Sequence, residues 1–228
     1  MELLHFTGQV WRPPYEASSQ LLQVTAGCTH SKCKFCSLYH GTKFRLSPIA
    51  EVEEDLKVIQ DYQPRARRVF LTGANPFALS YNRLLDLGLL IRKYLRYCES
   101  IGMFSRISDI KSKTVEELQN LRHLGFDSIS IGTESGDDNT LAMMNKGYTA
   151  NDIIEQCKKL EEANIRYNFV YLTGLAGRNK GEQNAVNTAN VFNQLHPFTI
   201  NFVSLTVFPE SELYQEIQCG NFVEATEH

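Results

Sequence analysis

The chain has 228 residues and a formal net charge of −3, with 43% hydrophobic and 21% charged residues. This composition is typical of a globular protein and supplies enough apolar side chains for a sizeable core. The charge balance shows no evident nucleic-acid-binding patch, and no apolar run approaches the ~20 residues that a membrane-spanning helix needs. We therefore expect a cytoplasmic protein without membrane association.

Apolar strands and amphipathic helices alternate along the chain. A polar leader covers residues 1–20, and the first strand is expected at 21–27. Five further strands are expected at 68–74, 103–110, 126–133, 166–174 and 199–208. Helices are expected at about 48–62, 81–99, 114–124, 149–163, 181–195 and 211–218.

This alternation predicts an α/β fold in which helices cover a parallel sheet. Six strand–helix units fill residues 21–218, so we predict one domain over residues 1–228. Two architectures fit the pattern: an open doubly wound sheet and a partial (β/α)6 TIM-like barrel with parallel strands. In both, functional residues gather at the C-terminal ends of the strands.

Three of the six cysteines lie within nine residues, directly after the first predicted strand. Cys28, Cys33 and Cys36 have the spacing Cys-x4-Cys-x2-Cys. Three thiolates can bind three irons of a [4Fe–4S] cluster and leave the fourth iron open to another ligand. His30 lies in the same loop, so structural zinc on the three cysteines and His30 is an alternative. A second alternative is a cluster that only transfers electrons.

The cysteine loop resembles that of the radical S-adenosylmethionine (radical SAM) superfamily. Its members carry three closely spaced cysteines after the first strand of a partial (β/α)6 barrel, most often as Cys-x3-Cys-x2-Cys. Phe35 stands where they have an aromatic residue before the third cysteine. Residues 132–149 also resemble the Gly-x-Glu-Ser-Gly…Leu-x-x-Met-Asn-Lys-Gly-Tyr-Thr stretch of elongator-type, methylthiotransferase and coproporphyrinogen-oxidase-like proteins.

The resemblance implies that S-adenosylmethionine lies across the strand ends. Gly73 and Asn75 are expected near its methionine amino group, where the superfamily usually has Gly-Gly-Glu. Glu134 can accept hydrogen bonds from the ribose hydroxyls or the amine, and Lys146 can pair with the carboxylate. The remaining residues expected to bind the cofactor are Phe35, Arg106, Ser108 and Gly174.

The resemblance also implies an oxygen-sensitive enzyme. A one-electron donor such as flavodoxin or ferredoxin would reduce the cluster, and S-adenosylmethionine would then be cleaved to methionine and a 5′-deoxyadenosyl radical. That radical would act on a substrate that no motif in the chain names.

Overall fold

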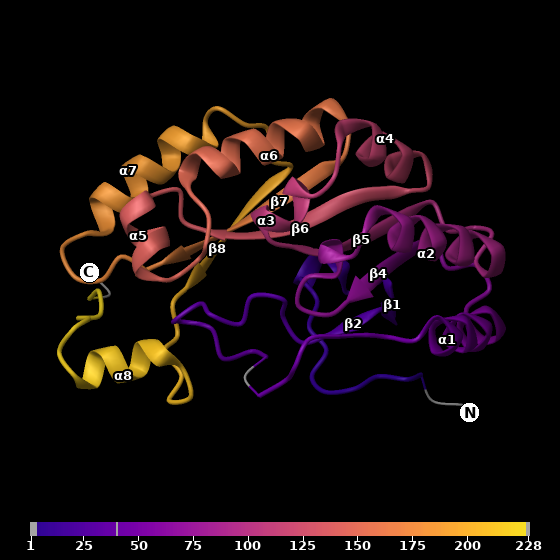
Figure 1. Cartoon of the computed structure of the whole chain (residues 1–228), viewed down its shortest axis with the longest axis horizontal. Helices are drawn as coiled ribbons and strands as arrows, with labels where there is room; N and C mark the ends of the chain where they lie inside the picture. The colour runs from indigo at the N-terminus through magenta and orange to yellow at the C-terminus, as the bar shows by residue number, and fades with distance from the viewer. Residues whose placement is uncertain (1–3, 40, 227–228) are drawn as a thin grey trace.

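The computed structural model describes residues 4–39 and 41–226, which form an α/β fold around one six-stranded sheet (Figure 1). The strands follow one another in space in chain order, and every neighbouring pair is parallel. They are β1 (Gln20–Gln23), β4 (Arg68–Thr72), β5 (Ser100–Ser105), β6 (Phe126–Glu134), β7 (Arg166–Thr173) and β8 (Thr199–Ser204).

The helices form an arc along the outer side of this sheet, from α7 through α6, α4 and α2 to α1 in Figure 1. Because the strand order never reverses, the sheet has no topological switch point, and the doubly wound alternative is wrong. The predicted partial (β/α)6 barrel is confirmed. The longer helices are α1 (Ile49–Tyr62), α2 (Tyr81–Tyr94), α4 (Val115–His123), α6 (Ala150–Glu162), α7 (Gly181–Phe192) and α8 (Glu212–Gln218), and the short ones are η1 (Pro14–Glu16), η2 (Pro76–Ala78), α3 (Ile107–Lys111) and α5 (Asp138–Met143).

The first predicted strand is divided into two. After β1, the chain continues into β2 (Thr25–Ala26), which pairs antiparallel with β3 (Arg45–Leu46). The cysteine loop lies between β2 and β3, so this small ribbon anchors both ends of the loop beside the main sheet. The sequence pattern did not predict β3, because a two-residue strand has no measurable periodicity.

The third strand ends earlier than predicted, and this changes the place of Ser108. The predicted strand at 103–110 is β5, which ends at Ser105, followed by the helix α3. Ser108 therefore lies in α3 and not in the strand, and Arg106 is the residue before that helix. The helix begins here because the Asp109 carboxylate accepts the Arg106 backbone N–H at 2.8 Å.

Two apolar clusters hold the fold together. The larger one packs the outer face of the sheet against the helices, with Leu71, Ile131 and Phe169 among its fully buried residues. The smaller one contains Met144, Leu172, Leu175, Leu213 and Phe222, and it joins α8 to the strand ends. Consequently α8 packs on the cysteine loop, where the Leu213 N–H donates to the carbonyl of Lys34 at 2.8 Å.

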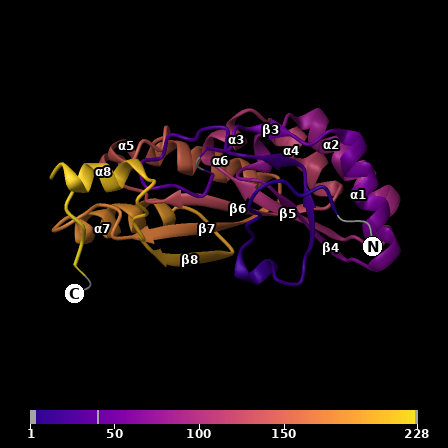
Figure 2. The same ribbon diagram turned by 90° about the horizontal axis from the view of Figure 1, so that it is seen from below.

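The leader reaches the face of the sheet opposite α2 and α4 (Figure 2). Its Glu16 is only 1% exposed and accepts hydrogen bonds from the Arg68 guanidinium, one of them at 2.7 Å from Nε. The Tyr15 hydroxyl shares a 2.7 Å hydrogen bond with the Ser130 hydroxyl. A buried, paired charge fixes the described part of the leader to the sheet.

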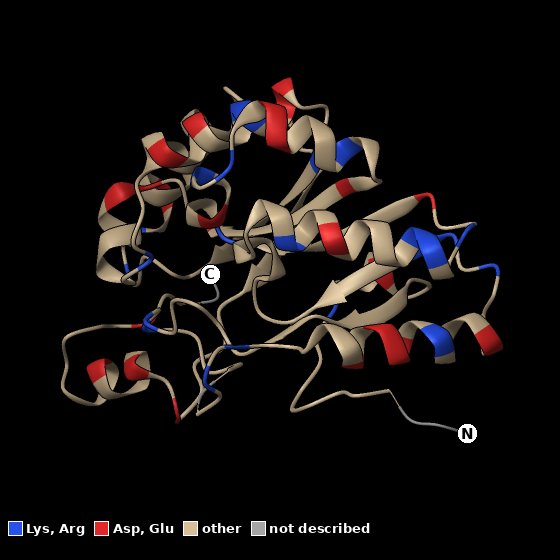
Figure 3. Ribbon diagram, turned by 45° about the vertical axis from the view of Figure 1, so that its right-hand side comes forward, with Lys and Arg blue, Asp and Glu red and all other residues tan. Residues whose placement is uncertain are grey.

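Basic residues (blue) and acidic residues (red) both occur along the helices in Figure 3. Among the helices of residues 4–39 and 41–226, none is long and apolar enough to cross a membrane.

Candidate functional site

The three clustered cysteines line one cavity of about 540 Å³ beneath the loop between β2 and β3. Burial raises the pKa of the Cys33 thiol, while the positive charges of Lys146 and Arg106 lower it. Burial likewise raises the pKa of Cys36. Three thiols on one cavity, with no fourth cysteine among its lining residues, fit the ligand set of a [4Fe–4S] cluster that keeps one iron open.

His30 turns its ring toward the segment after α5. Its Nε2 lies 2.6 Å from the carbonyl oxygen of Asn145, and since a carbonyl only accepts, Nε2 carries the proton and donates. This bond engages one ring nitrogen of His30 and leaves Nδ1 outside it, so the zinc alternative on the three cysteines and His30 stays untested by the geometry.

Asn75 fastens the cysteine loop at its first cysteine. The side chain is fully buried, its Oδ1 accepts the Thr29 N–H at 3.2 Å, and its Nδ2 donates to Thr29 Oγ1 at 2.6 Å. Nδ2 also lies 2.9 Å from the Asp109 carboxylate. The amide thus joins the neighbour of Cys28 to α3, a contact between distant segments, and its expected role beside the methionine amino group stays a prediction.

Gly73 is required by a contact within the chain. Its φ of +132° is rarely adopted by other residues, and a Cβ here would lie 2.0 Å from the Oγ1 of Thr25. That Thr25 oxygen and the Oγ1 of Thr72 are both buried without a hydrogen-bond partner. A buried, unpaired hydroxyl costs about 1–3 kcal/mol, so this strand end carries unmet hydrogen-bonding capacity.

Glu134 and Lys146 form a buried ion pair at the end of β6. The Lys146 Nζ lies 3.6 Å from Glu134 Oε1, and the two side chains are only 4% and 14% exposed. Burial alone would lower the pKa of Lys146, but Tyr148 and Glu134 outweigh it and raise that pKa. Burial raises the pKa of the Glu134 carboxyl against the effect of the lysine. The Lys146 ammonium also lies 5.6 Å from the Phe35 ring centroid, which brings the pair to the cysteine loop.

Arg106 joins this pair from the adjacent strand end. Its guanidinium donates to the Ser108 hydroxyl at 3.0 Å and to the carbonyl of Lys146. Beside it, the Tyr148 hydroxyl donates to the Gly132 carbonyl at 2.9 Å, and burial raises the pKa of this phenol to about 12. Phe35, Arg106, Ser108, Glu134 and Lys146 therefore belong to one connected group.

Tyr148 is the member of this group that sequence reasoning missed. It belongs to the Met-Asn-Lys-Gly-Tyr-Thr stretch, so its position in that motif was the available signal. Gly174, by contrast, lies at the end of β7 with Leu205 as its close neighbour, apart from this group.

Residues with a strained backbone lie in the cysteine loop and in segments that contact it. Five non-glycine residues in the described part of the chain have a positive φ, and Ser31 (+44°), Glu134 (+62°) and Asn145 (+55°) are among them. Asn145 also donates from its side chain to the Lys32 carbonyl at 2.9 Å. Strained residues of this kind persist where the surrounding contacts determine a functional geometry.

Comparisons with known proteins agree on one family. The Radical SAM superfamily matches residues 22–189 of this chain. The heme chaperone HemW of Bacillus subtilis (strain 168) is 23% identical over 203 residues, which are 85% of this chain and 52% of that protein. This chain thus spans about half the length of that relative.

Two solved structures show the same fold. TsrM from Kitasatospora setae, a radical S-adenosylmethionine methyltransferase solved with cobalamin and a [4Fe–4S] cluster, matches with a TM-score of 0.72 at 18% identity. That match covers 89% of this chain and 40% of TsrM. Coproporphyrinogen III oxidase (HemN) from Escherichia coli, a radical SAM enzyme, matches with a TM-score of 0.63 at 16% identity, over 87% of this chain and 46% of that chain.

Proposed function

Because the chain belongs to the radical SAM superfamily, we propose that it is an enzyme with a [4Fe–4S] cluster on Cys28, Cys33 and Cys36 and S-adenosylmethionine at the adjoining strand ends. When bound and reduced, such a cluster supplies the electron that splits S-adenosylmethionine into methionine and a 5′-deoxyadenosyl radical. The electron would come from a protein of the flavodoxin or ferredoxin class, and the radical would act on a separate substrate.

The observation that carries the proposal is the position of unpaired polar atoms. In the described part of the chain, three buried side-chain polar atoms have no hydrogen-bond partner: Thr25 Oγ1, Thr72 Oγ1 and Arg106 Nε. They lie in β2, at the end of β4 and just after β5, so they follow neighbouring strand ends. Unmet hydrogen-bonding capacity at neighbouring strand ends supports a polar ligand site in this part of the fold.

The surrounding side chains fit the two ends of such a ligand. Arg106 and Lys146 bring two positive charges to the site, which suits a carboxylate. Glu134 is acceptor-only when ionised, which suits an amine or ribose hydroxyls. These residues would bind and orient the cofactor. The buried surroundings of the Glu134–Lys146 pair would keep water away from the cofactor.

Electron paramagnetic resonance of the anaerobically reconstituted, dithionite-reduced chain tests the proposal. We expect about four irons per chain and a spectrum that changes when S-adenosylmethionine is added, because the open iron gains a ligand. Adenosine, which lacks the methionine part, should leave the spectrum unchanged. A full iron content with a spectrum indifferent to S-adenosylmethionine would favour the electron-transfer alternative, and a chain that takes up zinc but no iron would refute the cluster.

A further inference from the structure

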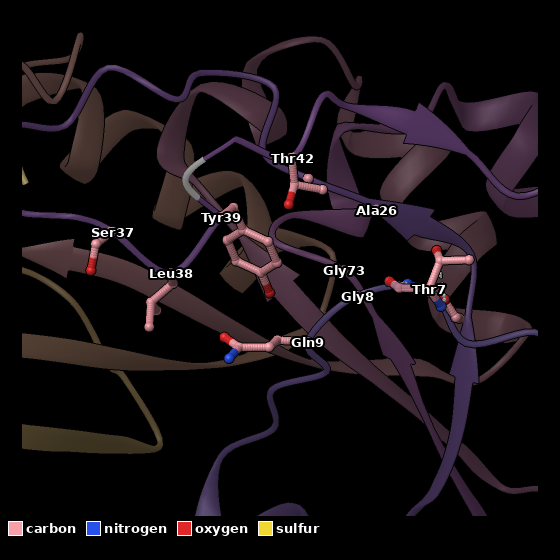
Figure 4. Close-up of a pocket in the computed structure, with 11 residues that line it drawn as sticks. Thr7, Gly8, Gln9, Ala26, Ser37, Leu38, Tyr39, Thr42 and Gly73 are labelled. Atoms are coloured by element: carbon pink, nitrogen blue, oxygen red, sulfur yellow. Dashed lines mark hydrogen bonds between the residues drawn. The ribbon is translucent and has the colours of Figure 1, made fainter. Parts of the chain in front are cut away.

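Figure 4 shows the lining of a second cavity, of about 350 Å³. Tyr39 and Thr42 line both cavities, so they form the boundary between them. The other walls of the second cavity include Thr7–Gln9 of the leader, Gln23 of β1 and Gly73. It is therefore placed next to the proposed radical source, on the side where the leader covers the strand ends.

The leader wall of this second cavity is held in a fixed position. The Thr7 N–H donates to Gln23 Oε1 at 2.7 Å, and Gln23 Nε2 donates back to the Thr7 carbonyl at 3.2 Å. Gln23 is itself only 3% exposed. His5, two residues before Thr7, is bound to the Asp55 carboxylate through its Nδ1 at 2.8 Å. These hydrogen bonds hold the leader wall of the cavity against β1 and α1.

The chemistry of the lining is polar but uncharged. No lysine, arginine, aspartate or glutamate lines the second cavity. Four of its side chains can donate or accept hydrogen bonds and use none of this capacity within the described residues: Gln9, Ser37, Tyr39 and Thr42. In Figure 4 the Tyr39 hydroxyl points to the side on which Gln9 lies.

A cationic group in this lining would lose hydration without gaining a counter-charge, which is unfavourable. The Arg45 guanidinium at the Thr7 wall is already engaged, because it donates to Thr7 Oγ1. A neutral group with amide, carbonyl or hydroxyl functions would instead pair with the amide of Gln9 and the hydroxyls around it. We propose that this cavity binds the substrate of the radical enzyme and selects an uncharged, hydrogen-bonding group. The assignment of this cavity to the substrate rests on the proposed function. The preference for an uncharged group rests on the residues that line the cavity.

Saturation-transfer NMR with three probes of matched size tests the selectivity: benzamide, benzoate and benzylammonium. With the anaerobically reconstituted chain, we expect several-fold more transfer to benzamide than to either ion. The Gln9→Ala/Thr42→Val double variant should lose most of the benzamide signal. Gln119→Ala, which changes an exposed glutamine on α4, should keep it.

Equal transfer to all three probes, preference for an ion, or an unchanged signal in the double variant would overturn the inference. So would displacement of benzamide by S-adenosylmethionine, because the cavity would then belong to the cofactor. If the double variant does not fold, Gln9→Glu replaces it, since Gln9 is exposed and tolerates the change. That carboxylate should shift the preference from benzamide to benzylammonium, and no shift would again refute the inference.

The iron content of the same samples tests the proposed function separately, because it measures whether the cluster forms and not what the second cavity binds.

Discussion

Replacing Cys28, Cys33 or Cys36 with serine is expected to lower the iron bound after anaerobic reconstitution from about four atoms per chain to near zero. The three thiols line the same cavity, and no other cysteine is among its lining residues. Removing one therefore leaves two ligands, and the serine hydroxyl is a poor substitute for a soft thiolate. Iron and sulfide analysis, together with the visible absorption of the cluster, measures the effect.

Cys219→Ser is the matched control for these variants. Cys219 is an exposed thiol directly after α8 and lies outside the thiol cavity. Its replacement should leave the iron content unchanged. Normal iron content in any one of the three loop variants, or a loss of iron in the control, would show that the cluster is bound differently.

Replacing Lys146 with methionine is expected to lower the free energy of unfolding by about 3–5 kcal/mol, because Glu134 would remain as a buried charge without its partner. The variant also loses the hydrogen bond from Lys146 Nζ to the Gly132 carbonyl, which is 2.8 Å long. Urea denaturation of the metal-free protein measures the change without interference from cluster loss. Lys158→Met, on the exposed side of α6, should change stability by less than about 0.5 kcal/mol.

The double variant Lys146→Met/Glu134→Leu separates stability from function. Removing both charges should restore most of the lost stability, since a buried ion pair can be replaced by apolar side chains at little cost. The response of the reduced cluster's spectrum to S-adenosylmethionine should not return, because the positive charge that suits the cofactor carboxylate is absent. A double variant with a normal response would contradict the role proposed for Lys146.

Local patterns predicted the elements that local interactions stabilise. The helix expected at 114–124 is α4, whose start is fixed by a local pair: the Thr114 Oγ1 accepts the Glu117 N–H at 3.1 Å. The end of β5 was predicted wrongly because apolar residues continue into α3, whereas the hydrogen bond that the Arg106 N–H donates to the Asp109 carboxylate starts a helix there. The side chain of Asp109, four residues after the end of β5, decided the boundary, and hydrophobic periodicity does not record it.

In the candidate site, too, the sequence predicted residues that are close together in the chain and missed contacts between distant ones. The cysteine spacing and the stretch that contains Glu134 and Lys146 are continuous in sequence, and they mark most of the connected group. The bond between Asn75 and Thr29 joins residues 46 positions apart, and no short motif encodes such a contact. The second cavity depends on where the leader lies against β1, which follows only from the fold.

The most direct test of the proposed function is the formation of 5′-deoxyadenosine, measured by mass spectrometry after anaerobic incubation with dithionite and S-adenosylmethionine. The proposed function predicts that this product accumulates with time in proportion to the amount of reconstituted chain, and that it is absent with the Cys33→Ser variant. A chain with a full cluster that forms no more 5′-deoxyadenosine than that variant would contradict it.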